Sequence, residues 1–227
     1  HFYNNCQILL SGQVSDEAVH TVQQHLQALP AQTTPQSQVV APTAVATEEH
    51  VSQPNRLQAA IQIGKVLLTK NHPDYLPLSC VNTLLGGYFG ARLMSNLRED
   101  KGYTYGIYSR IVALQHASYL QIATDVIQKY AQAACQEIEK EIRQLQTTPV
   151  PTEELHLLRN YLMGNFLAHI NDPFSIMDRF KDVHWHGLDQ AHYTRLYETI
   201  HQLNADQIMT LAQQYLTTDS LSTVVVG

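Results

Sequence analysis

The chain has 227 residues, of which 44% are hydrophobic, so it can bury one large core or two smaller ones. Charged residues make up only 15% and the net charge is −6, without a basic patch, which argues against nucleic acid as a partner. No apolar run is long enough to span a membrane, so we expect no membrane partner either. The three scattered cysteines, Cys6, Cys80 and Cys135, give neither a disulfide framework nor a Cys-x-x-Cys metal pair.

The first thirty residues are predicted to form a strand followed by a helix. Residues 6–14 are an apolar run typical of a buried strand. Ser15 offers a helix N-cap, two acidic residues follow it, and apolar residues then recur at helical spacing up to Pro30. Residues 31–54 are rich in Pro, Thr, Gln and Ala without periodicity, which predicts a linker. The main body then covers residues 55–227, and we expect residues 1–227 to form a single domain.

The main body is predicted to begin with strands and to continue mostly with helices. Alternating residues predict strands over residues 57–68, 103–112, 117–123 and 221–226, with the second and third as an antiparallel pair. Helical spacing predicts helices over residues 73–85, 89–100, 128–145, 152–166, 174–186, 189–201 and 204–216. Because strands and helices do not alternate regularly, the order indicates an α+β layer architecture.

Residues 82–108, NTLLGGYFGARLMSNLREDKGYTYGIY, are the segment most informative about function. Arg98 is expected near the end of a short helix, and Tyr103 and Tyr105 on one face of the strand that follows. A guanidinium and a phenol brought together can donate hydrogen bonds to a peptide carbonyl or to a developing oxyanion. From the residues alone, a solvated helix end beside half-buried tyrosines remains the simpler interpretation.

Four glycines punctuate this segment. Gly86, Gly87 and Gly90 lie within five positions and permit a tight turn and a close approach of the backbone, while Gly102 separates the short helix from the strand. The run is not a phosphate-binding loop, because it lacks the Lys-Ser/Thr step and follows a helix. We expect these glycines to be structural.

The run GGYFGARLMSNLREDKGYTYGIYS resembles the signature of the C-terminal, non-metal-binding domain of M16 (pitrilysin-like, inverzincin) zinc peptidases. That signature has glycines, a small residue with Arg-Leu, then Leu-Arg-Glu and Gly-x-x-Tyr. The segments SGQVSDEAV and LSTVVVG resemble the opening and closing segments of the same domain. The resemblance implies an M16 peptidase-like (LuxS/MPP-like) sandwich, in which an antiparallel sheet is covered on one side by long helices. It also implies that Arg98 and Tyr105, seven positions apart, contact the substrate beside the scissile bond.

The zinc motif of that family, His-x-x-Glu-His on one helix face, does not occur in this sequence. None of the 12 histidines begins it, and Glu48-Glu49-His50 lacks the first histidine. The resemblance therefore implies that this chain binds no metal or cofactor, is inactive alone, and holds peptide opposite a catalytic half that carries zinc. That half would precede His1 in the same chain or belong to a partner subunit.

Two alternatives stay open. The chain is otherwise a non-catalytic structural subunit of a larger assembly, or a peptide-binding module without a hydrolytic partner. A homodimer, formed through surface that the other half would cover, is also compatible with the sequence.

Overall fold

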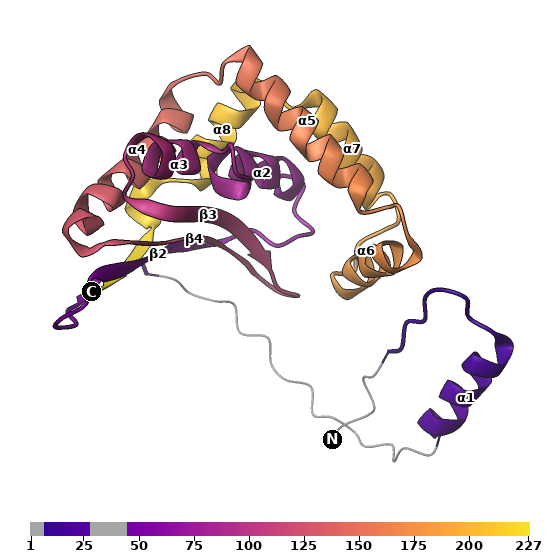
Figure 1. The fold of residues 1–227 in the computed structure, drawn as a ribbon. Helices are drawn as coiled ribbons and strands as arrows, with labels where there is room; N and C mark the ends of the chain where they lie inside the picture. The colour runs from indigo at the N-terminus through magenta and orange to yellow at the C-terminus, as the bar shows by residue number, and fades with distance from the viewer. Residues whose placement is uncertain (1–6, 28–44) are drawn as a thin grey trace.

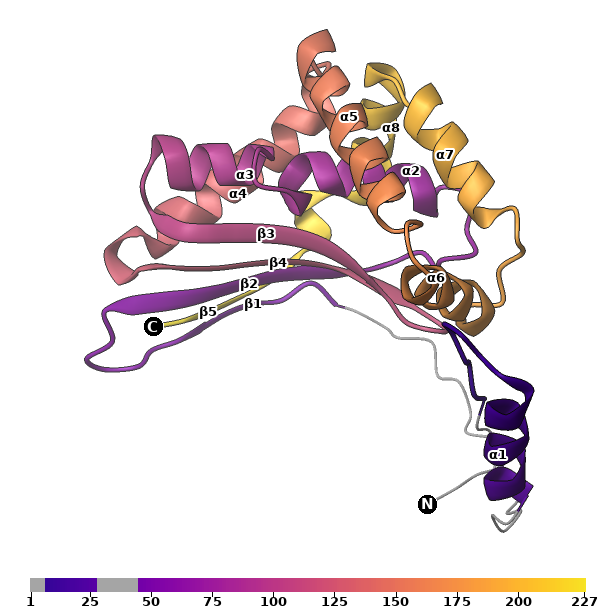
Figure 2. The same cartoon turned by 45° about the vertical axis from the view of Figure 1, so that its right-hand side comes forward.

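The computed structural model describes residues 7–27 and 45–227 (Figure 1). One mixed sheet runs through the body in the order β1-β5-β2-β4-β3. Its strands are β1 (Glu48–Val51), β2 (Gln58–Leu67), β3 (Thr104–Ala113), β4 (Ser118–Ile127) and β5 (Ser222–Val226). The described helices of the body gather on one face of this sheet (Figures 1 and 2). The α+β architecture with helices on one side is therefore confirmed, but the sheet that was expected to be antiparallel is mixed, because β1 pairs with β5 in parallel.

The helices lie close to their predicted positions. They are α1 (Asp16–Gln27), α2 (Tyr75–Asn82), α3 (Arg92–Met94), α4 (Ala131–Thr147), α5 (Thr152–Ala168), α6 (Pro173–Trp185), α7 (His192–Gln202) and α8 (Ala205–Tyr215). Short turns of π- or 3-10 type extend several of them: η1 (Thr83–Gly87), η2 (Ser95–Asp100), η3 (Gln128–Tyr130) and η4 (Thr218–Ser220). None of the described helices is both long and apolar enough to cross a membrane.

The hydrophobic core lies between the sheet and the helices above it. Strands β2 and β4 pair antiparallel from Gln58↔Ile127 to Leu67↔Ser118, which aligns their alternating side chains. Ile61 of β2 and Ile122 of β4 are fully buried, and Ile138 of α4 is buried in the same cluster. The alternation of buried and exposed residues along β2 thus follows from a sheet with one covered face.

The predicted N-terminal strand is wrong for residues 7–14, which form no regular element, while Cys6 lies outside the described residues. The helix that follows is confirmed, and the amide of Ala18 donates to Ser15 Oγ at 3.2 Å, as expected for an N-cap. No residue of α1 is buried. A strand requires a neighbouring strand for its backbone hydrogen bonds, and the described part of the sheet pairs none with residues 7–14.

The predicted linker also requires a correction at its C-terminal end. Residues 28–44 lie outside the described part of the chain, but β1 falls within the predicted linker and pairs in parallel with β5. All four residues of β1 are exposed, and the segment is short and polar, so no alternation of apolar residues marks it in the sequence. The C-terminal strand is confirmed, and it lies inside the sheet between β1 and β2.

Candidate functional site

The candidate site is built on a close contact between η1 and β3. Gly86 lies within η1 but departs from helical geometry, with φ −161° and ψ 18°. A Cβ at this position would lie 2.7 Å from Ser109 Cβ and 2.8 Å from the Ser109 amide nitrogen, so only glycine fits. Beside it, Ser109 Oγ donates to Asn82 Oδ1 at 2.5 Å, and Asn82 Nδ2 donates to the Ser109 carbonyl at 3.1 Å. This buried pair fixes the start of the glycine loop on the edge strand of the sheet.

The loop over residues 86–91 is held by an aromatic anchor. The ring of Tyr88 stacks on Tyr161 of α5, with ring centroids 4.6 Å apart. A Cβ at Gly90 would lie 3.0 Å from Tyr88 Cε2, so the absence of a side chain there leaves room for this ring. The Ala91 amide donates to the Tyr88 carbonyl at 3.1 Å and closes the turn. The predicted helix over residues 89–100 therefore begins later than expected, at Arg92.

Ion pairs and hydrogen bonds clamp the short helical segment onto α4 and α5. Arg92 Nε and Nη2 donate to the two carboxylate oxygens of Glu154 at 2.7 and 2.8 Å. Burial alone would lower the pKa of Arg92, but the hydrogen bonds and charge of Glu154 raise it. Asn96 Nδ2 donates to Glu141 and Glu137 at 2.6 and 2.9 Å, and the bond from Asn96 helps to lower the pKa of Glu137. These contacts with α4 and α5 hold the backbone segment that carries Arg98 in place.

Arg98 lies in η2, where the helix widens to a π-turn. The Lys101 amide bonds to the Asn96 carbonyl five residues earlier at 3.0 Å. The Arg98 side chain is 37% exposed, its Nε lies 3.5 Å from Glu99 Oε1, and its Cζ lies 4.7 Å from the ring centroid of Phe89. Phe89 was not among the residues predicted to form the site. The feature of the sequence that could have indicated Phe89 is an aromatic residue between Gly87 and Gly90.

A β-bulge presents Tyr105 at the start of β3. The register between β3 and β4 shifts between Thr104 and Ile107. Thr104 Oγ1 accepts a hydrogen bond from the Gly106 amide at 3.0 Å, and Thr124 Oγ1 lies 2.9 Å from both Thr104 Oγ1 and the Gly106 carbonyl oxygen. These hydroxyls satisfy backbone groups that the bulge removes from the ladder. The side chain of Tyr105 is 91% exposed.

The expectation that Tyr103 and Tyr105 share one strand face is wrong. Tyr103 precedes the strand, and its ring stacks on Tyr130 at a centroid distance of 4.6 Å. The chain turns at Gly102, which has a φ of +63° in the left-handed region that favours glycine. The turn and the bulge together separate the two tyrosines, so that one packs and the other faces solvent.

Arg98 and Tyr105 lie on the two sides of the Gly102 turn, on the surface of the molecule. No hydrogen bond or ion pair joins them to each other within the described residues. One side chain carries a cation with several N–H donors, and the other carries a phenol that donates and accepts. The arrangement can offer hydrogen bonds to the carbonyl groups of an extended chain.

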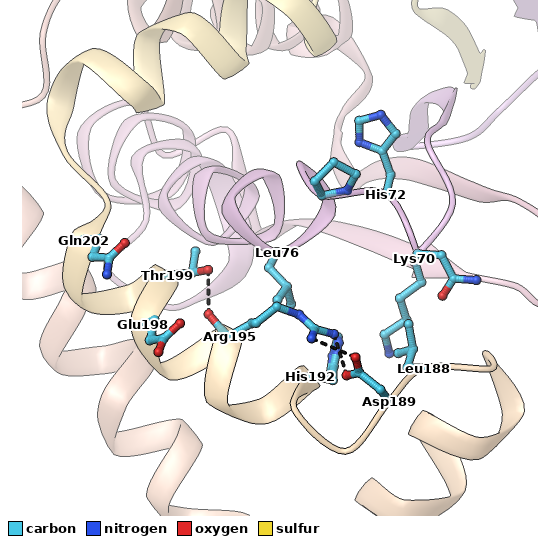
Figure 3. A pocket seen from close by; sticks show the side chains of 12 residues that line it. Lys70, His72, Leu76, Leu188, Asp189, His192, Arg195, Glu198, Thr199 and Gln202 are labelled. Atoms are coloured by element: carbon cyan, nitrogen blue, oxygen red, sulfur yellow. Dashed lines mark hydrogen bonds and ion pairs between the residues drawn. The ribbon is translucent and has the colours of Figure 1, made fainter.

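A separate pocket of about 390 Å³ lies between α7 and the loop that precedes α2 (Figure 3). Three of its charged groups, Lys70, Asp189 and Arg195, form ion pairs. Arg195 donates to both carboxylate oxygens of Asp189 at 2.8 and 3.0 Å, and Lys70 Nζ lies 2.6 Å from both carboxylate oxygens of Asp182. No residue of this pocket belongs to residues 82–108, so the pocket is not part of the candidate site.

The described residues do not fit a metal centre. Across residues 7–27 and 45–227, no group of three or more His, Cys, Asp or Glu side chains is placed to hold a metal ion. The partial match to a zinc motif, Glu48-Glu49-His50, lies on the exposed strand β1, where His50 Nε2 is 3.2 Å from Glu48 Oε1. Two ligands on a strand do not reproduce the helical spacing that a His-x-x-Glu-His site requires.

The model of the family described as "Peptidase M16 inactive domain" matches residues 3–162 of this chain. The Bacillus subtilis protein described as the uncharacterized zinc protease YmxG is 25% identical over 179 residues, which cover 76% of this chain and 42% of that protein. The chain thus spans less than half the length of this relative.

Solved structures share the fold. The peptidase M16 inactive domain from Pseudomonas fluorescens aligns with a TM-score of 0.80 and 21% identity, over 95% of this chain and 52% of that one. A protease from Helicobacter pylori aligns with a TM-score of 0.79 and 17% identity, over 96% and 54%. A chain in Complex III2 from Candida albicans aligns with a TM-score of 0.72 and 11% identity, over 94% and 53%. Because the model of the M16 inactive domain matches most of its length, the chain belongs to the M16 peptidase family.

Proposed function

We propose that this chain is the substrate-holding half of an M16-type metallopeptidase, which works opposite a half that carries the zinc ion. The observation that carries the proposal is the exposure of Arg98 and Tyr105 on a backbone that is otherwise fixed. The buried Asn82–Ser109 and Arg92–Glu154 pairs hold this backbone. A fixed backbone that presents two donor side chains to solvent suits binding, because the backbone loses little conformational entropy when the ligand binds.

The chemistry follows from the donor groups. The peptide would lie extended between the two halves, which enclose a chamber like a clamshell. The Tyr105 hydroxyl would donate to the scissile carbonyl as it becomes an oxyanion, and the Arg98 guanidinium would fix a neighbouring carbonyl. Zinc on the other half would supply the activated water. This chain then contributes orientation and charge stabilisation, and is expected to be inactive alone.

The direct test compares peptide hydrolysis and zinc content for this chain alone and for the complete protein or pair of subunits. We expect the isolated chain to hold no zinc and to cleave nothing, whereas the complete system contains zinc and cleaves peptides. Zinc-dependent cleavage by the isolated chain would overturn the proposal.

Two substitutions test the assigned residues in the complete system. Tyr105→Phe and Arg98→Ala should each lower kcat/KM for peptide cleavage by roughly a hundredfold, the usual cost of losing one oxyanion donor, while zinc content stays unchanged. Matched controls are Tyr119→Phe on β4 and Arg143→Ala on α4, which change the same residue types at other places. Near-normal cleavage by both test variants would remove Arg98 and Tyr105 from the site.

A non-catalytic structural or peptide-binding role is the second candidate. The specific observation in its favour is that the same fold occurs in a chain of Complex III2 from Candida albicans. A structural subunit should bind its partner stably and give no peptidase activity with any zinc-carrying half. A peptide-binding module should bind extended peptides as the isolated chain, whereas the peptidase proposal expects weak binding until the two halves meet.

A further inference from the structure

We propose that Phe89 is a positioning residue, which holds the Arg98 guanidinium in place for the substrate. The inference rests on the proposed function of Arg98. Phe89 is 65% exposed, although it is a large apolar side chain on a segment with well-packed neighbours. The exposed ring lies against the guanidinium of Arg98, whose Cζ is 4.7 Å from the ring centroid, within the range of a cation–π contact.

The loop around Phe89 is built to keep the ring on the outside. On one side, the Tyr88 ring turns inward and stacks on Tyr161. On the other side, Ala91 is fully buried and its amide closes the turn onto the Tyr88 carbonyl. Gly86 cannot move outward without losing its contact with Ser109. With its neighbours anchored, Phe89 is the residue of this loop that projects toward Arg98.

Glu99 also contacts the Arg98 guanidinium, so the position of this group depends on both Glu99 and the ring of Phe89. Glu99 Oε1 lies 3.5 Å from Arg98 Nε, at the margin of a hydrogen bond. An arginine side chain has many rotamers, so a single exposed ion pair at this distance orients it poorly. The face of Phe89 adds a second restraint from another part of the chain, which leaves the edge of the guanidinium free to donate. Positioning of this kind acts on the rate because a misplaced donor stabilises the transition state less.

The test measures kcat/KM for peptide cleavage by the complete zinc-containing protein in a double-mutant cycle. Phe89→Leu keeps an apolar side chain but removes the π face, and should lower kcat/KM about two- to fivefold, the fold-change that corresponds to an exposed cation–π contact. Phe89→Tyr keeps the face and should restore the rate. In the Arg98→Ala background, Phe89→Leu should have no further effect, because the group that it positions is gone.

The same substitution at Phe174, which is 60% exposed on α6, is the matched control and should leave the rate unchanged. An equal loss from Phe89→Leu with and without Arg98 would overturn the positioning role, since a merely structural residue acts in both backgrounds. Full activity of Phe89→Leu beside a strongly impaired Arg98→Ala would also overturn it, and would leave the proposed function intact. Normal activity of Arg98→Ala itself would instead reject the role proposed above for Arg98, and with it the positioning role of Phe89.

Discussion

Gly86 occupies the point at which the backbone of η1 touches strand β3. Its φ of −161° is accessible to any residue, so the requirement is one of space alone. A Cβ there would meet the Ser109 backbone nitrogen at 2.8 Å, which a side-chain rotation cannot relieve. We expect Gly86→Ala to lower the free energy of unfolding by about 1–3 kcal/mol, as overpacking does elsewhere. Urea denaturation monitored by circular dichroism would measure this loss.

Gly164 of α5 provides the opposite case at the residue scale. It lies in a helix, and a Cβ there would meet nothing within 4 Å. Gly164→Ala should therefore stabilise the protein by about 0.5–1 kcal/mol, through reduced entropy of the unfolded chain. A destabilised Gly164→Ala, or an undisturbed Gly86→Ala, would show that contact with β3 is not what decides the effect of these glycines.

The bulge at the start of β3 is the element that presents Tyr105. Its backbone is satisfied by the hydroxyls of Thr104 and Thr124. Thr104→Val keeps the shape of the side chain but leaves the Gly106 amide without its acceptor, so we expect a loss of about 1–3 kcal/mol in unfolding free energy. Faster hydrogen exchange at the Gly106 amide should accompany this loss. Unchanged exchange at Gly106 would mean that the ladder, and not the hydroxyl, maintains the bulge.

The elements that were predicted well from the sequence are those whose conformation depends mainly on neighbouring residues in the chain. Strand β2 shows the alternation of a one-sided sheet, and α8 begins at a capping box between Asn204 and Gln207, with bonds of 2.9 and 3.1 Å. By contrast, β1 has no local signal, since it is a strand only because β5 lies beside it. Residues 7–14 show the reverse, because a strand-like pattern without a partner strand forms no strand.

The candidate site was only partly predictable for a similar reason. The sequence indicates that Arg98 and Tyr105 flank a turn, because Gly102 marks that turn locally. It does not indicate which tyrosine packs, since this depends on Tyr130, which is 27 residues beyond Tyr103. Nor does it indicate that Phe89 lies against Arg98, which results from the fold of the glycine loop on β3. Pairings between distant parts of the chain set these details.

At the scale of the whole molecule, one charged cluster joins α6 and α7 to the body. Lys70, from the loop after β2, donates to Asp182 of α6 at 2.6 Å, and His186 Nδ1 lies 3.2 Å from the same carboxylate. His192, at the start of α7, is only 4% exposed beside this cluster. Burial lowers the pKa of His192 below 6.5, and the charge of Lys70 lowers it further, while Asp182 opposes them.

The lowered pKa of His192 predicts how stability depends on pH. Below about pH 6.5, the unfolded chain binds a proton at this histidine more readily than the folded protein does, so the free energy of unfolding should fall as the pH is lowered from 7.5 to 5.5. His192→Gln removes the titrating group and should flatten this dependence, whatever its effect on absolute stability. His116→Gln, at an exposed site in the turn between β3 and β4, should leave it unchanged. Denaturant titrations across this pH range would reveal the slope, and an equally steep slope in His192→Gln would assign the effect to other groups.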